Sequence, residues 1–267
     1  MCRGGFGVRR WCCFLLLWIG GGAAAAEQAV APQPLSIGVE AFVWEEFYAG
    51  ERLLREQGPR LLLGLERDNL QRRWPGLVYR ARVRGHLARV AYRGRSQDAA
   101  GVSYPLNTVT DYLGGGARLL LGQRLGYLPD GRFLDLYLGL EGRLWLRDIR
   151  GAVDEGGRYA VGYRELYRLL AVQAAVGLGR AERGGAGLVI GASYPLRVVE
   201  WVSLGGRTLR PRGRLGGWLA FRLPPWHGVS LSLEVDWLDL GASPAVEGYF
   251  QPDSRALRLG AVFSWRG

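Results

Sequence analysis

The sequence contains no lysine. All 35 basic residues are Arg, against 24 acidic residues, so the formal net charge is +11 over 267 residues. Beyond the N-terminus, no run approaches the roughly 20 apolar residues of a membrane-spanning helix, which excludes a helical membrane bundle. The 42 Gly residues have no three-residue period, which excludes a collagen-like chain. The apolar content of 48 %, with 10 Trp and 12 Tyr, argues against a disordered chain.

Residues 1–26 have the pattern of a secretory signal peptide. Three Arg residues precede a short apolar stretch at 12–19, and small residues at 20–26 end in an Ala-x-Ala site before Glu27. An uncleaved membrane anchor is the competing interpretation, but the short apolar stretch and the small residues after it favour cleavage. We therefore predict two segments, a signal peptide at 1–26 and one domain at 27–267.

Removal of residues 1–26 changes the chemistry available to the chain. The remaining domain has 32 Arg and 24 acidic residues, a net charge of +8, and no cysteine, because Cys2, Cys12 and Cys13 all lie in the removed segment. Disulfides and cysteine-ligated metal sites are thereby excluded from it.

The main signal after residue 26 is alternation with a period of two. In the segment 132–147, RFLDLYLGLEGRLWLR, Leu occupies six alternate positions from Leu134 to Leu146, broken only by Gly142. Charged residues, aromatics and Gly139 occupy the positions between them. Successive side chains of a strand point to opposite faces, so this segment predicts a strand with one apolar and one ionic face.

Nine further segments alternate in the same way, giving ten predicted strands. They are 37–45, 60–66, 77–85, 112–124, 166–178, 188–196, 212–223, 229–237 and 257–265.

The polar face mixes Arg and Glu with many Gly and an occasional aromatic residue. A soluble β-sandwich explains alternation, but it does not require small residues on its polar face. The interior of a narrow closed barrel does, because space there is limited and charges must pair. The other face is dominated by Leu, Val and Ala, as lipid contact demands. We therefore predict an all-β fold, an antiparallel transmembrane β-barrel of about ten strands, with eight or twelve as alternatives.

The connections alternate in length. Long external loops are expected at 47–59, 93–109, 148–162, 200–211 and 239–254, and mostly shorter turns at 67–76, 126–131, 179–186 and 224–228. Short periplasmic turns and long external loops are typical of transmembrane barrels. Aromatic residues near strand ends suggest two girdles at the membrane interfaces. The predicted girdles contain Trp44, Tyr92, Trp145, Trp201 and Trp237 at one side, and Tyr79, Phe133, Phe221 and Trp265 at the other.

The last predicted strand resembles the assembly signal of small outer-membrane β-barrel proteins of Gram-negative bacteria. It has apolar residues at alternate positions before a terminal aromatic residue: Leu257, Leu259, Ala261, Phe263 and Trp265. The sequence departs from that pattern because Arg266 and Gly267 follow the aromatic residue. The resemblance covers essentially all of residues 27–267. It implies an outer-membrane location, export, and passage through the barrel-assembly machinery.

Arg on the polar strand faces is the most distinctive chemical feature. The predicted lumen set is Arg80, Arg82, Arg84, Arg118, Arg124, Arg143 and Arg147, with Glu40, Glu66, Asp135, Glu141, Glu234 and Asp236 as partners. We favour an ion-paired plug, since the Arg fork binds carboxylates in a bidentate manner. The alternative is a narrow pathway for small anions, because Arg rings select anions in pores.

Signals for catalysis and for cofactors are absent from the sequence. The two His residues, His86 and His227, are not spaced for a metal site. His227 has Val229 where outer-membrane lipases have Ser, and the Gly114–Gly116 run has no following helix or Lys for a phosphate loop. We therefore predict no enzyme activity, no catalytic residues, no metal and no cofactor.

The leading functional hypothesis is a structural, adhesive or ligand-contact role of the external loops. A narrow anion channel is the alternative, and a lipid-modifying enzyme at the rim is a weaker third. The expected partners are outer-membrane lipid and lipopolysaccharide, whose phosphates Arg52, Arg55, Arg207 and Arg210 would contact, together with a surface ligand. Nucleic acid is not expected, because the Arg residues are spread over an exported sheet.

Overall fold

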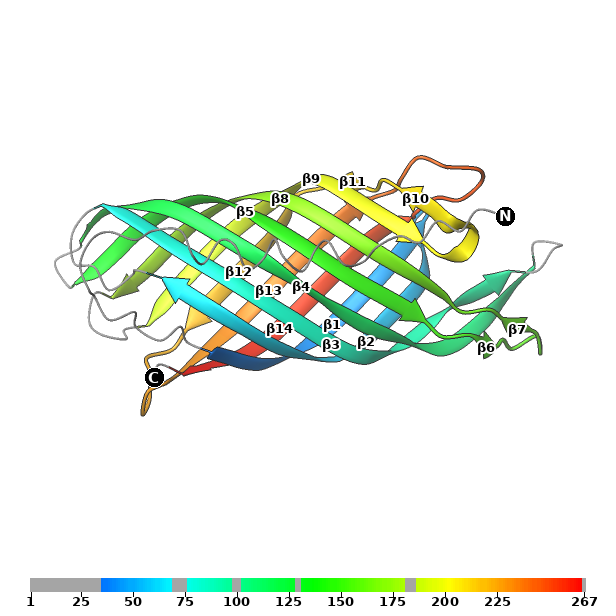
Figure 1. The fold of residues 1–267 in the computed structure, drawn as a ribbon, viewed down its shortest axis with the longest axis horizontal. Coiled ribbons are helices and arrows are strands. Elements are labelled where there is room, and N and C mark those ends of the chain that lie inside the picture. The colour runs from blue at the N-terminus through cyan, green and yellow to red at the C-terminus, as the bar shows by residue number, and fades with distance from the viewer. Residues whose placement is uncertain (1–34, 69–75, 98–101, 128–130, 181–185, 266–267) are drawn as a thin grey trace, which may run out of the picture. The chain divides into compact units, whose positions relative to one another are not determined.

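The computed structural model describes residues 35–68, 76–97, 102–127, 131–180 and 186–265. Within these ranges, ten antiparallel strands form the wall of a barrel (Figure 1). The wall strands are β1 (Leu35–Tyr48), β2 (Glu51–Asp68), β3 (Leu77–Gln97), β4 (Ser103–Tyr127), β5 (Arg132–Ile149), β8 (Tyr163–Arg180), β9 (Gly187–Val202), β12 (Gly216–Arg222), β13 (Val229–Gly241) and β14 (Asp253–Trp265).

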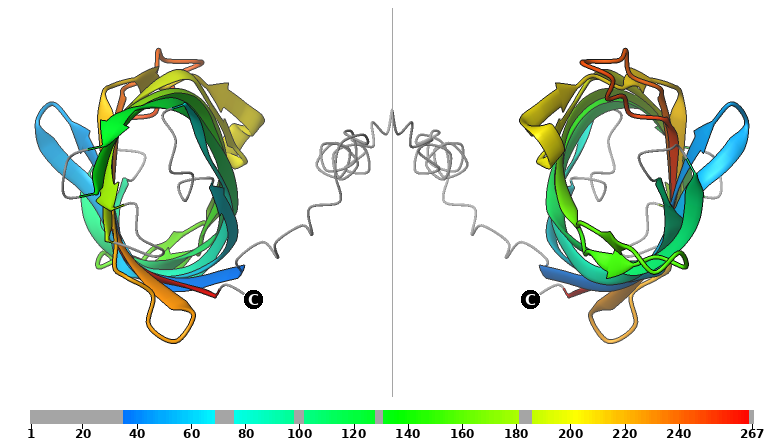
Figure 2. Two further views of the ribbon diagram at one scale, coloured as in Figure 1. Left: turned by 90° about the vertical axis from the view of Figure 1, so that its left-hand side faces the viewer. Right: turned by 90° about the vertical axis from the view of Figure 1, so that its right-hand side faces the viewer.

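Each wall strand pairs with its neighbours in the chain, and the ring closes between β1 and β14. For the described part of the wall, closure leaves no strand without a partner on either side, as a sheet in lipid requires. Figure 2 shows the ring end-on. Short strands lie at one end: β6 (Ala152–Val153) pairs with β7 (Tyr159–Ala160), β10 (Arg207–Leu209) with β9, and β11 (Arg212–Gly213) with β13. Among the described residues, no helix is long and apolar enough to cross a membrane.

The predicted fold class and all ten predicted strands are confirmed. The two faces also differ as predicted. On β5, Leu138 is 71 % exposed on the outer wall, whereas its neighbour Tyr137 is 3 % exposed in the lumen. The predicted signal peptide, residues 1–26, lies outside the described residues.

Two of the predicted external loops are largely strand. β1 and β2 join through Ala49 and Gly50, both with positive φ (50° and 85°), so the predicted loop at 47–59 is wrong. Two successive positive φ angles give a tight hairpin whose twist matches that of the strands. Similarly, β3 and β4 remain paired out to Gln97 and Ser103, so most of the predicted loop at 93–109 is paired backbone.

The outer wall carries two successive bands. An apolar band of exposed Leu, Val, Ile and Phe runs from the end at which β1 begins and β14 ends, here called the inner end. Beyond it, toward the turn at Ala49–Gly50 (the outer end), lies a collar of paired charges. The collar pairs include Glu45 with Arg52 and Arg55, Asp111 with Arg89 and Arg150, Asp148 with Arg150 and Arg164, and Asp239 with Arg214 and Arg255.

Four aromatic residues assigned to the girdles lie in the lumen instead. Trp44, Tyr92, Phe133 and Trp145 are all buried, with 1–7 % exposure, so this part of the girdle prediction is wrong. The alternation of side chains places them on the inward face. Trp145, for example, is two residues from Arg143 and two from Arg147, so all three side chains point to the same side of β5. Proximity to a strand end does not decide which face a side chain occupies.

Candidate functional site: the barrel lumen

The inner end of the lumen holds closed ion pairs. Arg124 binds Asp135 through Nε at 2.8 Å and Nη2 at 2.9 Å, and both side chains are fully buried. The hydroxyl of Tyr137 donates to the same carboxylate at 2.9 Å. Across the lumen, Arg222 contacts Glu66 at 2.6 Å and Asp68 at 2.9 Å, and Arg80 contacts Glu66 at 3.1 Å.

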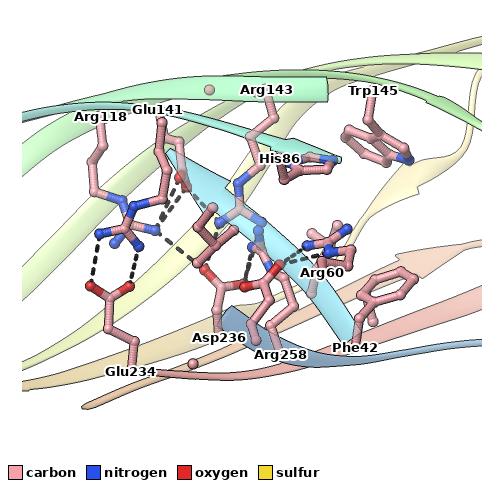
Figure 3. A pocket seen from close by; sticks show the side chains of 18 of the residues that line it. Phe42, Arg60, His86, Arg118, Glu141, Arg143, Trp145, Glu234, Asp236 and Arg258 are labelled. Carbon is pink, nitrogen blue, oxygen red and sulfur yellow. Dashed lines mark hydrogen bonds and ion pairs between the residues drawn. The ribbon is translucent and has the colours of Figure 1, made fainter. Parts of the chain in front are cut away.

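The middle of the lumen contains a cavity of about 80 Å³. Six Arg side chains and four carboxylates line it, with His86 and the aromatic residues Phe42, Trp44 and Trp145 toward the outer end. The Arg residues are Arg60, Arg82, Arg84, Arg118, Arg143 and Arg258, and the acids are Glu40, Glu141, Glu234 and Asp236. Figure 3 shows how these side chains converge from different strands.

Two networks cross the middle of the lumen. Glu234 of β13 accepts from Arg82 at 3.0 Å and from Arg84 at 2.6 Å, both on β3. Asp236, two residues further along β13, contacts Arg143 at 2.8 Å and also Arg258. The contacts of Glu234 with β3 and of Asp236 with Arg143 of β5 cross between non-adjacent strands and so fix the cross-section of the barrel, whereas Arg258 lies on β14, next to β13.

A third network, which shares Arg143 with the Asp236 network, anchors Glu141. Its carboxylate contacts Arg118 at 3.0 Å and Arg143 at 2.8 Å, and it accepts from Gln173 at 3.0 Å. The oxygen of Gln173 in turn accepts from the indole of Trp218 at 2.8 Å. Arg118 lies over the Trp218 ring, 4.3 Å from its centroid, which adds a cation–π contact.

Three buried donor or acceptor atoms at the cavity have no hydrogen-bond partner among the described residues. They are Nε of Arg84, Nε of Arg118 and Nε2 of His86. Buried polar atoms are almost always hydrogen-bonded, so three such atoms on residues that line one cavity are unusual.

A packed layer lies on the outer side of the cavity, and we call it the closing layer. Trp145 stacks on Tyr167 with ring centroids 4.8 Å apart, and Trp44 meets both rings edge-on. Next to these rings, Arg147 contacts Glu46 at 2.9 Å, Glu56 at 3.1 Å and also Glu165. The remaining closing-layer residues are Leu54, Val90, Tyr92, Tyr112, Ile149, Leu169, Val198, Glu200, Leu238 and Leu240.

Every closing-layer side chain is buried, and those of Arg147, Glu56 and Tyr167 have no measurable exposure. Eight of the ten wall strands contribute to the layer, and its apolar side chains belong to one packed, buried cluster. Two regions of opposite net charge therefore lie next to each other in the lumen. Arg is in excess around the cavity, and Glu is in excess in the closing layer.

All the predicted lumen residues lie on inward faces, but they separate into three groups. The first is Arg80, Glu66, Arg124 and Asp135 at the inner end. The second is Arg82, Arg84, Arg118, Arg143, Glu40, Glu141, Glu234 and Asp236 at the cavity. The third is Arg147, whose partners are Glu46, Glu56 and Glu165, none of them among the predicted acids.

Several lumen residues were missed by sequence reasoning. Arg258 lies between Leu257 and Leu259 of the last strand, so its inward direction follows from the alternation already noted. Glu56 lies in the part of β2 that was assigned to the 47–59 loop. Arg60 begins the predicted strand 60–66, but it was not counted among the lumen residues. Arg222 belongs to the predicted strand 212–223, where the alternation is weak.

The five residues of the predicted assembly signal lie on the outer face of β14. Leu257, Leu259, Phe263 and Trp265 are 41–49 % exposed, and Ala261 lies between them on the same face. The assembly role stays a prediction.

Comparison with known proteins does not assign the chain to a family. No family model matches the sequence, and no curated protein matches it. Several solved structures are similar in fold at low identity. The beta domain of the Bordetella autotransporter BrkA has a TM-score of 0.43 and 14 % identity, over 88 % of this chain and 99 % of that one.

Two further similar structures are Neisserial surface protein A and an outer membrane channel from Pseudomonas putida F1. The first has a TM-score of 0.34 and 12 % identity, covering 87 % of this chain and 97 % of that one. The second has a TM-score of 0.36 and 11 % identity, covering 91 % and 99 %. For this chain, the barrel is established by its own strand pairings.

Proposed function

We propose that the chain is an outer-membrane β-barrel whose lumen is closed and which acts through its outer rim at the cell surface, without enzyme activity. The closing layer is the observation that carries this proposal. A lumen filled with buried Trp, Tyr and ion-paired Arg has no continuous water path, so a structural or ligand-contact role fits better than permeation.

The two bands of the outer wall support the membrane placement. Exposed Leu, Val and Phe suit the hydrocarbon region, and the collar of charges beyond them suits the headgroup level. The collar guanidinium groups are accessible, with Arg89 67 % and Arg164 61 % exposed, so they can contact lipopolysaccharide phosphates. Of the Arg residues expected in this role, Arg52 and Arg55 belong to the collar.

The outer rim offers apolar groups for a surface ligand. Tyr48 at the β1–β2 turn is 57 % exposed and lies beside Phe250, with ring centroids 5.4 Å apart. In the β5–β8 connection, Tyr159 is 67 % and Val161 71 % exposed. Exposed aromatic residues at a rim are typical of contact surfaces, because they bury a large area at low entropic cost.

The cavity lining supports a role without nucleophilic catalysis. Among the described residues that line it there is no Ser, Thr, Tyr or Cys, and each of its four carboxylates contacts at least one Arg. His86 therefore has no nucleophile beside it there. Export and barrel assembly through the usual envelope machinery belong to the same proposal.

Planar-bilayer recording tests the closed lumen. Pure folded protein should give no steady conductance, whereas Trp44→Ala combined with Trp145→Ala should introduce current by opening the closing layer. A steady, anion-selective current through the unmodified protein would instead support the channel hypothesis, which rests on the Arg-lined cavity.

Surface binding tests the role of the rim. Cells that carry Tyr48→Ser with Phe250→Ser should lose adhesion to other cells or to immobilised matrix proteins, while the barrel still assembles. Leu138→Ala, on the lipid-facing wall, is the matched control and should leave adhesion unchanged. Equal adhesion of the rim variant and the unmodified protein would refute a role for this patch.

A further inference from the structure

We propose that the mid-barrel cavity is a binding site for one small divalent oxyanion of the phosphate or sulfate type. The inference goes beyond the surface role, since it concerns the part of the lumen on the inner side of the closing layer. It rests on an imbalance of charge, on buried atoms without partners and on the size of the cavity.

The charge imbalance is local to the cavity. At the inner end, positive and negative charges are equal in number. Arg124 forms an ion pair with Asp135, and Arg80 and Arg222 form ion pairs with Glu66 and Asp68. The described lining of the cavity, by contrast, has six guanidinium groups and only four carboxylates, an excess of two positive charges. Each of the six guanidinium groups contacts a carboxylate, but four carboxylates neutralise only four of the six charges, so a bound anion of charge −2 would stabilise this arrangement.

The closing layer has an excess of carboxylates, but these carboxylates are separated from the excess guanidinium charge at the cavity. Arg147 there faces Glu46, Glu56 and Glu165, with Glu200 also buried in the layer. The rings of Trp44 and Trp145 lie between those carboxylates and the cavity. None of the four carboxylates lines the cavity, so they offer it no hydrogen-bond acceptors.

The donors that would hold an oxyanion belong to Arg and His side chains that line the cavity. Nε of Arg84 and Nε of Arg118 are buried without a partner among the described residues, and Nε2 of His86 lies on the same cavity. Guanidinium groups bind oxyanions through short, charge-assisted hydrogen bonds. The existing carboxylate contacts hold the side chains of Arg84 and Arg118 in place through their Nη atoms and do not use the buried Nε–H groups.

The size of the cavity restricts the guest. A volume of about 80 Å³ is several times the roughly 10–15 Å³ that one water needs by the same measure, so a five-atom oxyanion fits. The aromatic side chains of the closing layer bound the site toward the outer end. A nucleotide or an inositol polyphosphate is too large for it.

Titration calorimetry on the folded, unmodified protein in detergent tests the site. Inorganic phosphate and sulfate should each bind with a stoichiometry of one and raise the thermal midpoint, as any ligand of the native state does. Inositol hexakisphosphate, which is attracted to exposed Arg but does not fit the cavity, should not compete. Absence of phosphate and sulfate binding would overturn the proposal, as would full competition by the large anion.

Two variants on one strand locate the site. Arg84→Gln should weaken phosphate binding by at least about tenfold, the effect of losing one charge-assisted hydrogen bond. Arg89→Gln removes the same charge from the outer wall of β3 and should change the affinity by less than about twofold. Equal losses in both variants, or no loss in Arg84→Gln, would refute the site. If Arg84→Gln does not fold, the competition result on unmodified protein decides alone. A failed anion test leaves the surface role untouched, because conductance and adhesion are measured separately.

Discussion

Replacement of Arg147 by Met should strongly destabilise the barrel. Arg147 has no measurable exposure and contacts the carboxylates of Glu46, Glu56 and Glu165 in the closing layer. Met has a similar length and is apolar, so the variant tests charge rather than bulk. It leaves three carboxylates in a buried layer without their cation.

The magnitude follows from the burial of the cluster. Breaking one buried ion pair by removing one partner costs about 3–5 kcal/mol, because the remaining charge stays buried without compensation. With three carboxylates affected, we expect the loss for Arg147→Met to reach at least this range at neutral pH. Adding Glu165→Gln should recover part of the loss, since one uncompensated charge fewer remains.

Urea unfolding of the barrel in lipid vesicles, followed by Trp fluorescence, measures this loss. The exposed pair of Arg89 with Asp111 gives the control, and Arg89→Gln should scarcely move the unfolding midpoint. If Arg147→Met and Arg89→Gln proved equally mild, the closing layer would have to be hydrated rather than packed, and the argument for a closed lumen would fail.

Three further predictions follow from other parts of the wall and rim. Gly139→Ala should cost about 1–3 kcal/mol in the same unfolding assay, because its Cβ would collide with backbone of β4, whereas Gly142→Ala meets nothing within 4 Å and should be neutral. Leu259→Arg places a charge on the lipid-facing wall, 49 % exposed, and should cost up to about 2–4 kcal/mol and lower the yield of folded barrel on heat-modifiability gels. The hydrogen bond from the Ser96 hydroxyl, with further donors from Arg158, holds the pKa of Asp154 below its usual range. This contact therefore stabilises the 150–162 connection above pH about 4 and is lost as the pH falls further, so pepsin should cut the connection faster below pH 4, and Asp154→Asn should remove that pH dependence.

The alternation of side chains accounts for what sequence could predict. In the apolar band, lipid on one side and a crowded lumen on the other impose a strict period of two, and the strand at 132–147 follows it throughout. Beyond the band, the outer face carries the charged collar and the inner face carries the buried charges of the closing layer, so polar residues occupy both faces and alternation fades although the backbone remains paired. This explains why β2 was predicted to start at Arg60 and starts at Glu51, and why the outer part of the β3–β4 hairpin, residues 93–109, was assigned to a loop.

The sequence predicts which face of its strand each lumen residue occupies, but not which residue it contacts across the barrel. Parity places Arg82, Arg118 and Arg143 in the lumen, but it does not give the height of one strand relative to another across the barrel. That height depends on the register of every pairing between them, and it decides that Arg143 meets Asp236 while Arg147 meets Glu56. The closing layer was missed for the same reason, because its residues come from strands spread around the whole ring.

Cysteine labelling from outside intact cells tests the closed lumen most directly, because residues 27–267 contain no cysteine of their own. Ser103→Cys lies exposed at the outer end, and Ala220→Cys lies on the inward face of β12, on the inner side of the closing layer. A small membrane-impermeant maleimide should label Ser103→Cys at once. It should label Ala220→Cys only after the outer membrane is permeabilised, and equally rapid labelling of both in intact cells would contradict a closed lumen.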